Sequence, residues 1–476
     1  MRRHFDRRLL WGLVLALGLA ARCRQYFLNA SYWYDEAFVI LVIRKVSYAE
    51  LLGALPFQVT APPFLLWIVR ALFLLGGAGE MLMRLPAFLA GLAALFLMIP
   101  LARRALGMPH AFWPFAFLAL GLHAVTHGSD VRAYTIDLLA AEIILLGALV
   151  LSEDAAGRRA CAWAWSGLFL SAAFAPWFSF PAVLMLGSAS SILAVHAWQR
   201  PERKRWLAWC ALQTVALVSI GLLWRLVARH RYYPGLIEHW QKGWDGFPDW
   251  RSGLDIARWL TKRLYEIGNY ANRDVGIILS LLAIVGAIFL CRKKPRLAGL
   301  LLVPFVLALG AALLGKYPLA HRTSLFLDPC LYLLAGAGVA GLASWRVLQG
   351  RLALLGVVVV LWSAGWMVRR TVRPDAGLDY RGAYQFIQSQ RAPGDVIWSQ
   401  MAVVYQTYYG PDAPVLQDHE FARAEQLVSV TRLWTVAGAN RPDFQAKLEA
   451  AGGRVVLQHQ VSGLGVRLFA PAKSNE

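Results

Sequence analysis

Two adjacent acidic residues, Asp35 and Glu36, follow three aromatic residues directly after the first long apolar segment of the chain. A carboxylate that is partly shielded from water is a stronger base, so such a pair at a membrane surface suits the deprotonation of a hydroxyl. In the structural alternative, Asp35 caps a helix over residues 36–46 and the aromatic side chains form an interfacial belt. The spacing alone does not decide between the two.

A second polar group occupies the short link from His127 to Tyr134, between two apolar runs. Asp130, Arg132 and Tyr134 alternate along this link, and Asp137 and Glu142 continue the series into the next apolar run. Ionisable side chains at membrane depth are costly and usually face a cavity or a charged partner. We therefore expect either the polar wall of a substrate-binding site or a structural ion pair between Asp130 and Arg132 that orients two helix ends.

A third group contains the basic residues Lys316, His321 and Arg322, which lie near another boundary between apolar runs. Such side chains can hold a phosphate or pyrophosphate group, and arginine does so with two parallel hydrogen bonds. Alternatively, they extend to the lipid headgroups at the rim of the protein. A metal site needs several nitrogen, oxygen or sulfur ligands, and no such set stands out. The metal ligands are therefore unknown, and a divalent metal cofactor is left open.

The composition identifies the class of protein that must position these residues. Of 476 residues, 58% are hydrophobic and 16% are charged, whereas soluble domains usually carry about 25% charged residues. This excludes a single water-soluble fold and a disordered chain, and it leaves a polytopic membrane protein. The net charge of +20 does not indicate nucleic-acid binding, because the basic residues form short clusters between apolar runs.

The apolar runs and the basic clusters together predict the topology. About eleven runs are long enough to cross a membrane, near residues 9–28, 84–101, 111–127, 132–151, 161–177, 180–198, 206–229, 275–291, 297–314, 324–345 and 352–368. Cytoplasmic basic clusters lie at Arg103 with Arg104, Arg158 with Arg159, 200–205, 292–296, and Arg346 with Arg351. The run from Pro62 to Gly77 begins with two prolines and contains Arg70, so we expect a helix in the membrane interface. If this helix crossed the membrane instead, the number of spans would rise by one and every later loop would lie on the opposite side.

The predicted topology places the first loop, 29–83, and the C-terminal segment, 371–476, on the outer face. The C-terminal segment is polar, and strand-like runs alternate in it with helix-like ones. The strand-like runs are Val396–Met401, Leu433–Val436, Arg454–Gln460 and Gly465–Ala470, and the helix-like runs are Tyr380–Arg391 and Arg441–Ala451. We therefore expect a helical transmembrane domain over 1–370, with juxtamembrane helices in its first outer loop, followed by a small soluble α/β domain over 371–476.

Five segments, in this order, resemble those of a known family: YWYDEAF, TAPPFLLWIVRALFLLGG, MRLPAFLAGLAALFLMIPLARRALG, HGSDVRAYTIDLL and KYPLAHRTSLFLDP. They are similar to the bacterial membrane glycosyltransferases of the GT-C superfamily, in the protein O-mannosyltransferase and aminoarabinose-transferase branch. The resemblance covers residues 1–200 well and recurs around 316–330. It implies an enzyme of the bacterial inner membrane that takes a sugar from a polyprenyl-phosphate carrier and transfers it to an acceptor at the outer, periplasmic face.

The resemblance also implies roles for individual residues. The catalytic base of the family falls on Asp35, with Glu36 beside it, and Arg322 falls where members have a basic residue that meets the lipid phosphate. Asp130 stands where relatives often carry glutamate, and it is followed by the matching Arg132 and Tyr134. Many members have His or Glu-Lys before the proline pair, whereas this chain has Thr60 and Ala61. A metal or phosphate role at those two positions is therefore not carried over.

The expected chemistry is a single displacement that inverts the anomeric carbon. Basic side chains offset the charge of the departing polyprenyl phosphate, so the reaction needs a base for the acceptor hydroxyl but no general acid. Two other functions fit the same sequence: a transporter or flippase of a lipid-linked sugar, and a non-catalytic family member that acts as an assembly subunit. The sequence does not name the sugar or the acceptor, which could be lipid A, a glycan or a protein.

Overall fold

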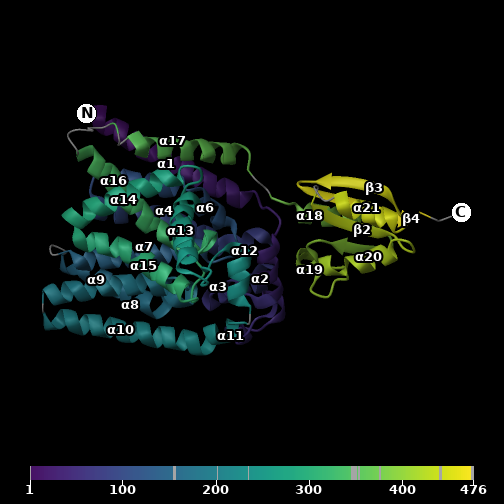
Figure 1. The fold of residues 1–476 in the computed structure, drawn as a ribbon, viewed down its shortest axis with the longest axis horizontal. Coiled ribbons are helices and arrows are strands. Elements are labelled where there is room, and N and C mark those ends of the chain that lie inside the picture. The colour runs from purple at the N-terminus through teal and green to yellow at the C-terminus, as the bar shows by residue number, and fades with distance from the viewer. Residues whose placement is uncertain are drawn as a thin grey trace.

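The computed structural model describes residues 2–153, 157–200, 202–233, 235–344, 351, 354–374, 377–438 and 442–472. Long helices lie side by side in one large body, and a small sheet with its own helices forms a lobe at one end of it (Figure 1). The predicted basic residue Arg346 and the first residue of one helix-like run, Arg441, lie outside these ranges. So do residue 201 of the basic cluster 200–205, residue 345 of the run 324–345 and the first two residues of the run 352–368. The polypeptide is thus a helical membrane-type body with a small C-terminal α/β lobe, as the sequence predicts.

Eight helices in the described ranges are long and apolar enough to cross a membrane. They are α4 (Glu80–Leu106), α7 (Tyr134–Ser152), α9 (Ala182–Gln199), α10 (Arg203–Leu223) with its continuation to Arg231, α14 (Gly276–Lys293), α15 (Pro295–Leu313), the segment His321–Ser344 that includes η5 (His321–Leu327) and α16 (Asp328–Ser344), and α17 (Leu354–Val372). Each of the eight overlaps one of the predicted apolar runs, and the ends agree to within a few residues.

The three remaining predicted spans also fall on helices, but these are less regular or more polar. Two of them are α1 (Arg2–Phe27) and α8 (Arg158–Phe178), of 26 and 21 residues. The third is divided into α5 (Phe112–Ala119) and α6 (Leu122–Thr126). The break lies at Gly121, where a Cβ atom would approach the Tyr332 hydroxyl to 2.8 Å. The count of about eleven spans therefore stays a prediction.

The first loop, 29–83, contains short helices rather than a further long apolar helix. Its elements are α2 (Tyr34–Lys45), η1 (Glu50–Leu52), η2 (Pro56–Gln58) and α3 (Pro63–Gly76). With 14 residues, α3 is about 21 Å long, whereas the hydrocarbon core of a bilayer is about 30 Å thick. Pro63 occupies the first helical position, where its missing N–H costs nothing. The length fits the expected helix in the membrane interface.

A second set of helices lies between α10 and α14. It consists of α11 (Arg229–Arg231), α12 (Leu236–Trp244) and α13 (Gly253–Ala271). The last of these begins at Ser252, whose hydroxyl accepts a hydrogen bond from the Asp255 amide and caps the helix.

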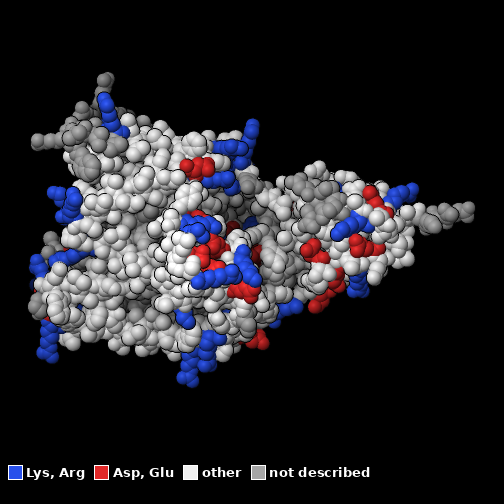
Figure 2. Space-filling view, in the orientation of Figure 1, with Lys and Arg blue, Asp and Glu red and all other residues white. Residues whose placement is uncertain are grey.

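On the face drawn in Figure 2, Lys and Arg lie at the end of the body far from the lobe and near the middle of the view, with a largely uncharged surface between them.

The C-terminal lobe is built on one four-stranded mixed sheet. Its strands are β1 (Val396–Ser399), β2 (Leu433–Gly438), β3 (Gly453–Val461) and β4 (Leu464–Pro471), in the order β1-β2-β4-β3. The first pair is parallel, the other two pairs are antiparallel, and the four predicted strands are confirmed. The helices of the lobe are α18 (Tyr380–Gln390), α19 (Ala402–Tyr409), α20 (Phe421–Leu427) and α21 (Pro442–Ala450).

The lobe packs against the helix that begins with the acidic pair. Buried residues of α19 and α2 belong to one hydrophobic cluster, which includes Val404, Tyr405, Ile40 and Ile43. The Thr407 hydroxyl also donates a hydrogen bond to the carbonyl oxygen of Ala37 in α2, at 3.4 Å. The C-terminal lobe therefore helps to hold the start of α2 in place.

Candidate active site

The helix α2 starts two residues before Glu36, and Glu36 closes its first turn. Trp33 is the N-cap, and the Glu36 carboxylate accepts a hydrogen bond from the Trp33 amide, at 3.3 Å. Asp35 is therefore not the cap, and the structural alternative of a helix over 36–46 capped by Asp35 is wrong. Because Glu36 supplies this contact, the Asp35 side chain is available for other partners.

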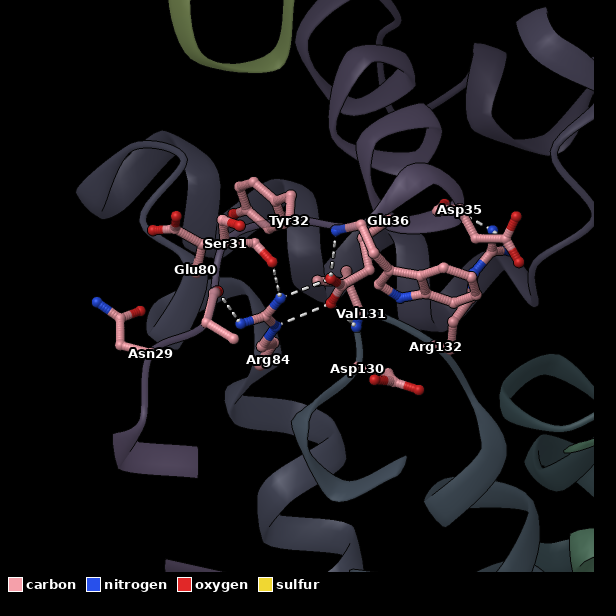
Figure 3. A network of polar contacts seen from close by, with 12 residues as sticks. Asn29, Ser31, Tyr32, Asp35, Glu36, Glu80, Arg84, Asp130, Val131 and Arg132 are labelled. Atoms are coloured by element: carbon pink, nitrogen blue, oxygen red, sulfur yellow. Dashed lines mark hydrogen bonds and ion pairs between the residues drawn. The ribbon is translucent and has the colours of Figure 1, made fainter. Parts of the chain in front are cut away.

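Glu36 forms a buried ion pair with Arg84 from the first turns of α4. The Arg84 Nη2–Glu36 Oε2 distance is 2.5 Å, and Arg84 Nε donates to Oε1 at 2.8 Å. The remaining guanidinium donors reach the carbonyl oxygens of Ala30 and Ser31, and the Val131 amide donates to Oε1 at 2.9 Å. Figure 3 shows Arg84 lying between Glu36 and the chain that precedes α2.

The burial of Glu36 determines what this residue can do. Its side chain has no exposed surface, and burial raises its pKa, while the charge and hydrogen bonds of Arg84 oppose that effect. Both carboxylate oxygens are occupied by donors from three segments of the chain. Glu36 thus fixes the first loop, α4 and the link after η3 to one another, whereas the Asp35 side chain is 22% exposed.

Asp35 faces two arginines that the sequence places far from it. The Arg322 Nη2–Asp35 Oδ2 distance is 2.6 Å, and Arg132 Nη2 lies 3.8 Å from the same oxygen. Arg132 Nη2 also donates to the Asp35 carbonyl oxygen at 2.6 Å. The three side chains are 22%, 15% and 14% exposed, so they are shielded but still reachable from outside. The three predicted residues therefore form one cluster.

Aromatic rings surround the guanidinium group of Arg322. Its central carbon lies 5.3 Å from the ring centre of Trp33, 5.8 Å from that of Tyr134 and 5.1 Å from that of Trp244. Such contacts stabilise a cation in a site with little water, and they keep its donors oriented. The rings come from the start of α2, the start of α7 and the end of α12, so the site is assembled at the boundary of these helices.

Asp130 has a different partner from the predicted one. Its Oδ2 lies 2.6 Å from His127 Nδ1, and His127 Nε2 lies 2.5 Å from the Tyr270 hydroxyl. Burial by itself would raise the pKa of Asp130, but the hydrogen bond and charge of His127, with the charges of Arg84 and Arg322, hold that pKa below its ordinary value. The expected ion pair between Asp130 and Arg132 is wrong, because His127 is closer in the same turn and Arg132 faces Asp35.

The other predicted residues are less closely tied to Asp35. Lys316 is exposed and has no ion-pair partner within the part of the chain that the structure describes. The exposed His321 has a left-handed backbone with φ 46°, and its ring lies 5.8 Å from that of Tyr270. Asp137 and Glu142 are buried within α7 and belong to the membrane-spanning body.

The structure offers no obvious metal centre. Among the described residues, no three His, Cys, Asp or Glu side chains are grouped closely enough to hold a metal ion. Near the proline pair, Ala61 contributes only its carbonyl oxygen, which accepts a hydrogen bond from the buried Arg231. That segment is thus held by an arginine from α11.

Three residues of the site were not assigned a role from the sequence. Arg84 belongs to the family-like segment MRLP, so its position was a usable signal. His127 lies in the link that was singled out, but a lone histidine does not reveal its partners. Tyr270 gave no signal, because it lies near the end of α13, in an ordinary amphipathic helix.

Comparison with known proteins gives similarity of fold. No family model matches the sequence, and no curated protein matches it. The structure of ArnT from Cupriavidus metallidurans in the apo state superposes with a TM-score of 0.58 at 14% identity, covering 96% of this chain and 97% of that one. The structure of ArnT from the same organism bound to undecaprenyl phosphate gives 0.53 at 15% identity, covering 97% and 98%. The chain therefore shares its fold with ArnT from Cupriavidus metallidurans, which agrees with the fold that the resemblance implied.

Proposed function

We propose that this protein is a glycosyltransferase that moves a sugar from a polyprenyl-phosphate donor to an acceptor hydroxyl, with Asp35 as the general base. The observation that carries the proposal is the partly exposed cluster of Asp35, Arg322 and Arg132. It places a carboxylate beside two phosphate-binding cations at the end of the membrane-type helices. A protein of the same fold has been crystallised with undecaprenyl phosphate, which supports this donor class.

The proposed reaction is one displacement at the anomeric carbon. The acceptor oxygen forms a bond to that carbon while its proton passes to the Asp35 carboxylate. The bond between the anomeric carbon and the phosphate oxygen breaks, and the electron pair leaves with the polyprenyl phosphate. Arg322 and Arg132 offset the negative charge on the departing group, and the product has inverted stereochemistry. A product with retained stereochemistry would overturn this mechanism.

The ion pair between Asp35 and Arg322 suggests how the donor prepares the base. Arg322 forms an ion pair with Asp35 at an Nη2–Oδ2 distance of 2.6 Å. A phosphate group carries more negative charge than a carboxylate and accepts two parallel hydrogen bonds from arginine. When the phosphate takes over Arg322, Asp35 is left free to accept the proton of the acceptor. The base is thus released only when the donor is present.

We place Tyr134, His127, Asp130 and Tyr270 around this reaction as positioning residues. Tyr134 packs against Arg322, and the series Asp130–His127–Tyr270 closes the adjacent wall. The exposed Lys316 and His321 are proposed to bind the charged part of the donor from the outside. Residues 371–476 are proposed to form a domain on the periplasmic face of the inner membrane, beside the acceptor.

The test uses the full-length protein in nanodiscs with a panel of polyprenyl-phosphate sugars and acceptor extracts. Release of free polyprenyl phosphate is compared between the wild type, Asp35→Asn and the control Asp249→Asn, which changes an exposed acid in the loop before α13. We expect release from one donor, lost in Asp35→Asn and kept in the control. Uptake of a labelled sugar lipid without product would support a transporter instead. A folded protein that neither transfers nor transports would support an assembly subunit.

A further inference from the structure

A second site lies at the end of α4 that is far from Asp35. An open groove of about 720 Å³ runs between α4, α7 and α8, and its walls include Leu97, Pro100, Ile143, Leu146, Trp163 and Gly167. From Arg84 to Arg103, α4 rises about 28 Å at 1.5 Å per residue. The groove therefore lies near the opposite membrane surface from the candidate active site and is independent of it.

The walls of the groove are apolar, whereas its end is basic. Arg103 and Arg104 line that end, and Arg158 and Arg159 precede the first lining residue of α8. Glu153 is the one carboxylate among the described residues at this end of the groove. It accepts hydrogen bonds of 2.8–3.1 Å from Arg104. Within the ranges that the structure describes, Arg103 has no ion-pair partner, and its guanidinium lies 5.5 Å from the ring centre of Trp11.

The depth of the charged end matches the level of lipid headgroups. Arg103 and Arg104 lie in the last turn of α4, and α8 begins at Arg158. Trp163, one turn further along α8, is 79% exposed and lines the groove. Exposed tryptophan and arginine at the ends of membrane helices typically mark the interface, and basic pockets between such helices bind anionic lipid headgroups.

We infer that this groove binds an anionic phospholipid, with one acyl chain between α4, α7 and α8 and the phosphate on Arg103. The apolar walls supply the contact for the chain. Arg103, which has no ion-pair partner among the described residues, supplies the preference for a negative headgroup. Gly167 leaves room for the chain, since a Cβ atom there would meet nothing within 4 Å.

The test measures which lipids stay bound to the full-length protein. The protein is equilibrated in mixed micelles with phosphatidylglycerol and phosphatidylcholine, and the retained lipids are counted by native mass spectrometry. The wild type should retain phosphatidylglycerol about fivefold better, because one arginine near a headgroup contributes about that factor. Gly167→Trp should lose both lipids, whereas Arg103→Gln should keep a bound lipid without the preference for phosphatidylglycerol.

The control is Gly221→Trp, which adds the same side chain to a position on α10 where a Cβ atom also meets nothing within 4 Å. It should retain lipid as the wild type does. Equal retention of the two lipids by the wild type would overturn the inference, and so would unchanged retention in Gly167→Trp. If Gly167→Trp does not fold, Arg103→Gln decides, because the inference requires that this variant lose the preference.

Discussion

The Asp35 carboxylate and the Arg322 guanidinium, from α2 and η5, meet at 2.6 Å beside the aromatic rings of Trp33 and Trp244. This contact joins the first loop to the segment that leads into α16. In the proposed reaction the same arginine must serve both the carboxylate and the donor phosphate. The two anions therefore compete for one cation, and this competition leads to distinct behaviour for variants of each residue.

Asp35→Asn should abolish transfer without abolishing donor binding. A general base contributes about 10²–10⁴-fold to a rate, so turnover should fall by at least about a hundredfold. Removing the carboxylate frees Arg322 from its ion pair, so the donor should bind at least as tightly as it binds the wild type. Donor affinity is measured by titration in nanodiscs, beside the release assay. Loss of binding together with turnover would contradict a role as base.

Arg322→Ala should mainly weaken donor binding. Hydrogen bonds to charged groups contribute about 1.5–3 kcal/mol, which corresponds to about a 10- to 100-fold increase in the dissociation constant. Arg322→Lys should recover only part of this, because an ammonium group lacks the planar, two-pronged geometry. The same titration serves as the measurement. An unchanged dissociation constant in Arg322→Ala would show that the phosphate lies elsewhere.

Glu36→Gln should destabilise the protein because it leaves the Arg84 charge buried. Removing one partner of a buried ion pair costs about 3–5 kcal/mol, and Arg84 is 5% exposed. The double variant Glu36→Gln/Arg84→Met should recover part of the lost thermal stability. Glu153→Gln is the control, since it breaks the half-exposed pair with Arg104 and should change stability by about 0–1 kcal/mol. Equal melting temperatures for Glu36→Gln and Glu153→Gln would contradict the structural role of Glu36.

Asp130 should stabilise the protein in a pH-dependent manner. Its pKa is below the ordinary value of 3.8 in the folded state, so the folded protein binds this proton less readily than the unfolded chain. The stabilisation is therefore complete above about pH 4 and is lost as the pH falls through the lower, folded-state value. Melting temperatures of the wild type and Asp130→Asn, measured between about pH 6 and pH 3, should converge at the acidic end. Parallel curves would contradict the assignment.

Tyr408→Phe should loosen the C-terminal lobe from the active-site loop. The Tyr408 hydroxyl donates to Glu80 at 2.8 Å and accepts from the Tyr32 amide at 2.9 Å. Its removal leaves that buried amide without a partner, which costs about 1–3 kcal/mol. Hydrogen exchange at the start of α2 should become faster, whereas the exposed neighbour Tyr409→Phe should leave it unchanged. Equal exchange in both variants would show that the lobe does not hold α2.

The sequence by itself determined the class of protein and most of the elements. Runs of apolar residues and their alternation report local periodicity, so the membrane-type helices and the four strands of the lobe could be predicted. The residue types and positions of Asp35 and Arg322 were enough to predict a base and a phosphate-binding cation. Such inferences can be made from sequence because hydropathy, turn residues and side-chain chemistry are properties of short segments.

Only the tertiary structure decided which charges meet. Asp35 and Glu36 are neighbours in the chain, yet one faces Arg322 in a shielded cluster and the other is buried against Arg84. Likewise, Asp130 pairs with His127 and, through it, reaches Tyr270 in α13. Successive residues at the start of a helix point in directions about 100° apart, so they meet different neighbours. Which neighbours these are depends on how distant helices pack, and no local pattern of residues contains that information.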